Sequence, residues 1–139
     1  MDRSTYQRTR RLAAPVLAFS LDRDAEDLAR KAGMASAGRA AQTLMKDGPV
    51  RLTLVGLKDG TSIHAHTAPG PITIQTLRGT LRIKAGDDVS TVPVGSLIAI
   101  EAELQHDVSA TGDSAFLLTL FLPEGGEDTT PAAQLAQEG

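Results

Sequence analysis

From about residue 40 onward, short apolar runs alternate with polar turn residues, a pattern typical of β-structure. The runs are rich in Leu, Ile, Val and Thr and recur every eight to ten residues or so. Gly and Pro between them supply the positive or fixed φ that a chain reversal needs. The turn signals are Asp47-Gly48-Pro49, Asp59-Gly60, Pro69-Gly70-Pro71, Arg78-Gly79, Gly86-Asp87-Asp88, Pro93-Val94-Gly95 and Thr111-Gly112-Asp113.

These reversals imply about eight strands, and therefore an all-β sandwich or barrel. The predicted runs are 41–46, 50–58, 61–67, 72–77, 80–84, 89–92, 96–101, 105–109 and 114–122.

A short helix is predicted before the strands, at 22–32. Ser20 or Asp22 can cap it, and acidic residues crowd its first turns and basic residues its last. Gly33 can end it in the left-handed conformation. The sequence leaves open whether this helix packs on its own barrel or on a partner's.

The chain then divides into an N-terminal arm and helix at 1–37, a barrel at 38–122 and a flexible acidic tail at 123–139. Apart from Leu135 the tail contains no large apolar side chain, which favours mobility.

Composition narrows the possibilities for both core and partners. At 139 residues the chain is the size of one domain, and 3% aromatic residues with no tryptophan predict an aliphatic core. With no cysteine, any metal must be bound by His, carboxylate or water. A net charge of −3 gives no broad basic field, so we expect no nucleic-acid partner.

The first residues resemble a secretory signal only weakly. Arg3, Arg8, Arg10 and Arg11 precede an apolar stretch that Pro15 interrupts and that is far shorter than the roughly 20 residues needed to span a bilayer. We therefore expect a basic arm on a cytoplasmic protein with no membrane partner.

All three histidines lie in predicted strands and are the candidate ligands of a metal site. Because residues two apart on a strand share a face, His64 and His66 are expected to point the same way. His106, from a distant strand, can supply a third imidazole.

Across about residues 50–122 the chain resembles the cupin superfamily, in particular small single-domain, RmlC-like jelly-roll cupins. Their first motif reads Gly, five residues, His-x-His, three or four residues, Glu, six residues, Gly. Gly60, His66 and Gly79 match this spacing, whereas Ala68 and Ile72 replace the second histidine and the glutamate. In a second register His64 and His66 form the pair, and the glutamate is still missing.

The second motif of the family reads Gly, five residues, Pro-x-Gly, two residues, His, three residues, Asn. Gly95 and His106 match it, but Glu101, Glu103 and Ala110 replace the proline, the second glycine and the asparagine. The two glutamates are expected either at the mouth of the pocket or in a surface turn.

The resemblance implies a cupin-type double-stranded β-helix, a jelly-roll barrel preceded by the short helix. It also makes His66 and His106 candidate ligands of a divalent transition metal such as Fe, Mn, Ni, Cu or Zn. Strand geometry alone offers His64 as a compensating third ligand, which would complete a mononuclear all-histidine site.

The interpretation is a small-molecule or metal-binding cupin of unassigned substrate. The alternatives are a non-haem, dioxygenase-like enzyme and a metal-free ligand-binding or sensing cupin, so whether the protein is an enzyme stays open. Because exposed edge strands favour pairing, a homodimer is expected.

Overall fold

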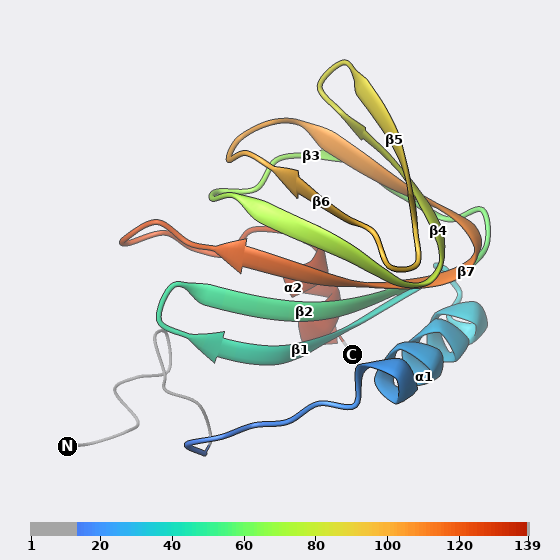
Figure 1. Cartoon of the computed structure of the whole chain (residues 1–139), viewed down its shortest axis with the longest axis horizontal. Helices are drawn as coiled ribbons and strands as arrows, with labels where there is room; N and C mark the ends of the chain where they lie inside the picture. Colours follow the sequence, from blue (N-terminus) through green and yellow to red (C-terminus); the bar gives the residue numbers. More distant parts are fainter. Residues whose placement is uncertain (1–13, 139) are drawn as a thin grey trace.

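The computed structural model describes residues 14–138, which form two helices and a sheet of seven strands (Figure 1). The basic arm predicted at the start of the chain lies almost wholly outside these residues. None of the helices in the described range is both long and apolar enough to cross a membrane. The elements are α1 (Leu21–Met34), β1 (Arg39–Asp47), β2 (Val50–Leu57), β3 (Ser62–His66), β4 (Ile72–Ala85), β5 (Asp88–Pro93), β6 (Leu97–Ile100), β7 (His106–Phe121) and α2 (Pro131–Glu138).

The strands are antiparallel and follow the order β1-β2-β7-β4-β5, while β3 pairs with β7 and β6 with β4. The sheet curls on itself (Figure 1). Its inward-facing side chains form one hydrophobic core. This core is aliphatic except for one phenylalanine, as the composition predicts. Its most buried members include Val55, Leu57, Ile74, Leu81, Ile83, Phe116 and Leu120. The predicted all-β barrel after a short helix is confirmed.

The predicted reversal at Arg78-Gly79 is wrong, because β4 runs through it as one bent strand. Inward-facing positions are even-numbered before the bend, as at Ile74, and odd-numbered after it, as at Leu81 and Ile83. Gly79 has φ +71°, and the β4–β7 register shifts on both sides of Arg78. A bulge therefore bends the strand here without ending it.

The predicted reversal at Thr111-Gly112-Asp113 is also wrong, because β7 continues through it. Two hydrogen bonds hold this bend against the β2–β3 turn: Gly112 N donates to Asp59 Oδ1 at 2.8 Å, and Asp59 N donates to Asp113 Oδ1 at 2.9 Å. These residues are typical of a turn, but Gly112, at φ +76°, forms a bulge within the continuous strand.

Helix α1 confirms the predicted helix. Ser20 occupies the N-cap position, but its side chain makes no capping hydrogen bond. The prediction that Gly33 ends it is wrong: Gly33 lies within the helix, and Ala35 is the extended C-cap. The left-handed glycine is Gly38, at φ +72°, in the turn that leads to β1.

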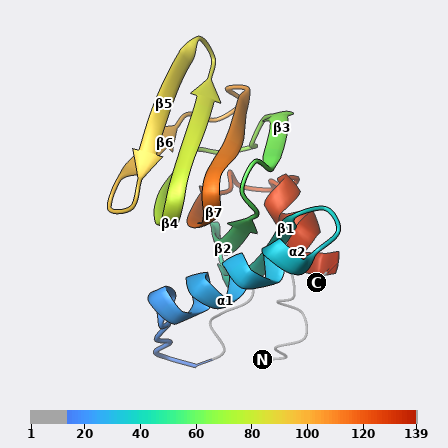
Figure 2. The same ribbon diagram turned by 90° about the vertical axis from the view of Figure 1, so that its right-hand side faces the viewer.

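The helix packs on the outer face of its own barrel, against β1, β2, β4 and β7. Ala25, Ala29 and Ala115 are buried in this contact. The backbone of α1 comes so close to Gly56 that a Cβ there would lie 2.5 Å from the carbonyl oxygen of Leu28. Figure 2 shows both helices gathered at the β1–β2 end of the sheet, away from β5.

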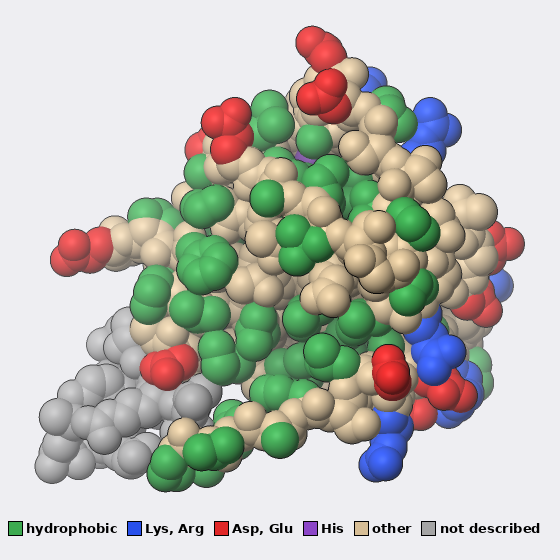
Figure 3. Space-filling model, viewed as in Figure 1, with side chains coloured by type: hydrophobic (Ala, Val, Ile, Leu, Met, Phe, Trp, Pro, Cys, Tyr) green, Lys and Arg blue, Asp and Glu red, His purple; other side chains and the backbone are tan. Residues whose placement is uncertain are grey.

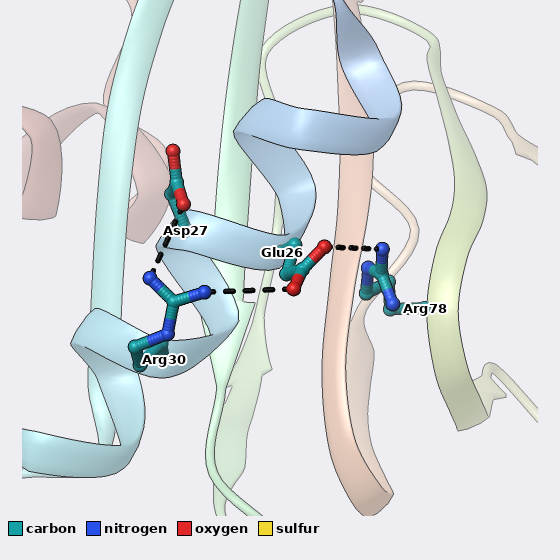
Figure 4. Close-up of polar contacts among 4 residues, drawn as sticks. All are labelled: Glu26, Asp27, Arg30 and Arg78. Atoms are coloured by element: carbon teal, nitrogen blue, oxygen red, sulfur yellow. Dashed lines mark hydrogen bonds and ion pairs between the residues drawn. The ribbon is translucent and has the colours of Figure 1, made fainter.

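A small charge network accompanies the docking of α1 (Figure 4). Arg78 of β4 pairs with Glu26 at 3.1 Å, and within the helix Arg30 pairs with Glu26 and Asp27 at 3.5 and 3.3 Å. The four side chains are 42–60% exposed, so each pair contributes roughly 0.2–1 kcal/mol at most. The small-residue packing, not the charges, therefore dominates this contact.

The segment predicted as a mobile tail contains a second helix, α2. Ala132 is buried in the barrel core, and Leu135 and Ala136 pack against it. Three apolar side chains at i, i+3 and i+4 give this short helix a face that the core accepts.

We predict opposite effects for alanine at Gly56 and at Gly33. Gly56→Ala forces α1 away from β2 and should lower the free energy of unfolding by about 1–3 kcal/mol. Gly33→Ala meets no atom within 4 Å and, through helix propensity, should raise it by up to about 1 kcal/mol. Urea denaturation of the two variants measures both changes, and equal effects would contradict the close contact of α1 with Gly56.

Candidate functional site

The candidate site lies inside the barrel, where the strands place two imidazoles among apolar side chains. His66 of β3 and His106 of β7 line this cavity. The strands add only hydrocarbon to it: Ile63, Ile72, Ile74, Val108, Phe116 and Leu118. A polar pair in such surroundings is the arrangement by which interior sites orient a ligand.

His66 and His106 are direct partners in the β3–β7 ladder. Their ring centroids lie 4.2 Å apart, with the planes inclined by 62° in an edge-to-face arrangement. His106 is only 3% exposed, and His66 is half-buried. The structure therefore brings together two of the three predicted site histidines.

The prediction that His64 shares the face of His66 is wrong. Ile63 pairs with Val108 and His66 with His106, so three steps along β3 match two along β7. One residue is thus inserted as a β-bulge, and the inward positions are Ile63 and His66. His64 is exposed and does not line the cavity.

Each ring of the pair is held by a hydrogen bond to the backbone carbonyl two residues before it. His66 Nδ1 donates to the His64 oxygen at 2.7 Å, and His106 Nδ1 donates to the Leu104 oxygen at 3.0 Å. Because a carbonyl only accepts, Nδ1 carries a proton in both rings. In the neutral form of either ring, Nε2 is therefore the acceptor.

Burial lowers the pKa of His66 below its ordinary value of 6.5. The hydrogen bond to the His64 carbonyl opposes this effect, the neighbouring His106 adds to it, and Asp107 opposes it. Desolvation is the largest influence, so His66 is neutral at pH 7.

The donor set does not fit the metal that the family resemblance implies. Ala68 and Ile72, at the positions of two family ligands, are both buried, and Ile72 lines the cavity. Glu101 and Glu103 are exposed and lie outside the cavity lining. Within residues 14–138 no three side chains of His, Cys, Asp or Glu are grouped to hold an ion. Two imidazoles are fewer than the three protein ligands usual at catalytic zinc.

The C-terminal segment completes the cavity wall with Thr130, Pro131 and Ala132. Asp128 Oδ1 accepts hydrogen bonds from N and Oγ1 of Thr130, at 3.0 and 2.6 Å. Thr130 Oγ1 accepts one from Ala133 N at 3.3 Å, so Thr130 caps α2.

Sequence reasoning missed this part of the site. The signal was Thr130 followed by Pro131, because a threonine N-cap before proline at the first helical position favours a helix start.

No protein-family model and no curated protein matches the chain. Solved structures do. A conserved protein of unknown function from Streptococcus pyogenes is 24% identical, with a TM-score of 0.59, and the match covers 64% of this chain and 78% of that one. A cupin superfamily protein from Desulfitobacterium hafniense is 18% identical, with a TM-score of 0.59, covering 61% of this chain and 78% of that one.

A third match is a salicylate 1,2-dioxygenase from Pseudaminobacter salicylatoxidans, at 12% identity and a TM-score of 0.67. It covers 84% of this chain but 38% of that enzyme. The strand order of the curled sheet and these matches show that the chain has the fold of the cupin superfamily.

Proposed function

We propose that this cupin barrel binds a small organic molecule in its interior through the His66–His106 pair, without a metal. The observation that carries the proposal is the pair itself: two neighbouring imidazoles, both with Nδ1 bound to backbone, in a wall to which the strands otherwise contribute only hydrocarbon. Such a wall binds an apolar body, and the two rings orient one polar group.

The chemistry of the pair defines the polar group of the ligand. Since each Nε2 is an acceptor, the pair suits a donor such as a hydroxyl or a protonated carboxyl group. An acidic group can also pass its proton to one ring, and the resulting anion then stays beside an imidazolium in a medium of low dielectric. The proposed ligand class is therefore a mostly apolar alcohol, phenol or carboxylic acid.

The two metal-based alternatives, a metal-binding cupin and a dioxygenase-like enzyme, need a third protein ligand. His64 was the candidate, and the bulge in β3 turns it outward. Ile72, at the position of the family's glutamate, adds hydrocarbon to the cavity wall instead of an oxygen donor. The metal-free alternative agrees better with both observations.

The homodimer and the cytoplasmic location stay predictions. In support of the homodimer, Figure 3 shows hydrophobic side chains spread over the face of the sheet that Figure 1 presents. The exposed large apolar residues include Val94, Leu97 and Phe121, at 59%, 57% and 45% exposure. Apolar surface of this kind favours contact with another protein surface.

The ligand prediction is tested by calorimetric titration of the protein with phenols and small carboxylic acids, salicylate among them. We expect one class to bind, and His66→Gln to weaken it at least about tenfold through the lost acceptor. His64→Gln, outside the cavity, is the matched control and should bind as wild type does. Equal loss in both variants, or no binding by any compound, would contradict the proposal.

The metal prediction is tested by elemental analysis of untagged protein after incubation with Fe, Mn, Ni, Cu or Zn. We expect less than about 0.1 equivalent of any metal, because two imidazoles make a weak site. EDTA should leave the melting temperature unchanged. Near-stoichiometric metal that both His66→Ala and His106→Ala abolish would instead establish a metal site.

The lowered pKa of His66 predicts how stability depends on pH. Around and below pH 6.5 the unfolded chain binds a proton more readily than the folded protein, so acidification destabilises the fold. The free energy of unfolding should therefore rise with pH through this window, and His66→Gln should flatten the rise. Urea denaturation from pH 5 to 8 measures it; an unchanged slope in the variant would show that His66 is not the group responsible.

A further inference from the structure

We propose that the C-terminal plug, defined as residues 130–138, is a built-in occupant of the ligand site and must leave the barrel before a ligand can enter. This inference rests on the proposed function for its biological meaning. The opening of the plug can be measured separately from ligand binding.

The first observation is the size of the cavity. With Thr130, Pro131 and Ala132 in its wall, the interior beside His66 and His106 has a volume of about 20 Å³. That is space for about one water molecule. A site for a drug-sized organic ligand has roughly 300–1,000 Å³. The barrel with its plug in place is therefore closed to the ligand that its lining suits.

The second observation is how lightly the plug is held. Its apolar contacts with the core come from one buried alanine, Ala132, and from the partly buried Leu135 and Ala136. The cap at Thr130 is a local bond, made with Asp128 and Ala133. A helix of eight residues is marginal on its own and depends on its packing. Loss of the Ala132 contact should thus release the whole plug.

The third observation is a turn that separates the plug from the barrel. Leu122 is buried, and its N donates to the Pro49 oxygen at 2.7 Å, so the chain is anchored up to this point. Residues 123–127 are then exposed, and Gly126 N donates to the Pro123 oxygen at 2.8 Å. Gly125 has φ +74°. Rotation within this turn can move the plug without disturbing any strand.

Together these observations describe a site that is occupied by its own chain until a ligand competes. The apparent affinity for ligand is then the intrinsic affinity reduced by the fraction of molecules that are open. A variant with a weakened plug should therefore bind ligand more tightly than the wild type.

The test uses the three histidines as reporters of access in the full chain. Diethyl pyrocarbonate modifies an unprotonated imidazole nitrogen, and mass spectrometry gives the rate at each residue. Ala132→Glu places a carboxylate in the core and expels the plug, while Gln134→Glu adds the same residue at an exposed position of α2 as the matched control. His64, exposed, is the internal reference.

We expect His66 and His106 to react at least about tenfold faster in Ala132→Glu than in Gln134→Glu, at an unchanged rate for His64. The proposal that the plug closes the site would be overturned if each of these two histidines reacted at the same rate in both variants while the circular dichroism of the folded barrel was retained.

If Ala132→Glu fails to fold, amide hydrogen exchange on the wild type tests whether the plug opens. The amides of α2 should exchange at least about tenfold faster than those of β7, through local opening. Exchange of α2 only with global unfolding would overturn the proposal. Faster modification of His66 and His106 without any ligand binding would establish the plug and refute the proposed function. Ligand binding without opening of α2 would support the proposed function and refute the plug.

Discussion

The pairing of β4 with β7 is the constraint on which the rest of the barrel depends. Their ladder runs from Ile72 opposite Leu120 to Ala85 opposite His106, and each of the strands β2, β3, β5 and β6 is paired to one of the two. Strands of 14 and 16 residues stay in a small barrel only if they bend. The bend lies at Gly79, whose φ is +71°. Only glycine fits there, because a Cβ would clash with Ser114 Oγ and would lie 2.7 Å from the Asp113 carbonyl oxygen.

The site is a consequence of where this ladder ends. His106 is the first residue of β7, paired with Ala85 at one end of the ladder, and it also pairs with His66 of β3. The inserted residue in β3 decides which of its two histidines turns inward. Because both rings give Nδ1–H to carbonyls of their own chain segments, backbone geometry sets their tautomers and leaves Nε2 to act toward a ligand. The register of the sheet thus determines which imidazole nitrogens are available to a ligand.

The same apolar interior that suits an organic ligand also suits the protein's own C-terminus. Ala132 contributes a small apolar side chain to the cavity wall, and an apolar group of a ligand could take its place. The hydrophobic effect is non-directional, so the wall does not distinguish the two. The imidazole pair does distinguish them, because the hydroxyl or carboxyl group of the proposed ligand would donate a hydrogen bond to an imidazole nitrogen. The hydroxyl of Thr130 in the plug is instead hydrogen-bonded locally, to Asp128 and Ala133.

The sequence by itself determined the class of fold, the aliphatic core, the helix at α1 and the strand positions of His66 and His106, because alternation and turn residues act over a few neighbours. Tertiary structure alone decided that Gly79 and Gly112 bend strands instead of reversing them, since a left-handed glycine serves a turn and a bulge equally well. It alone decided that His64 faces outward, because a bulge is defined by the partner strand. It also decided that α1 and α2 dock on their own barrel, since the apolar faces of short helices gain their stability from the surface that receives them.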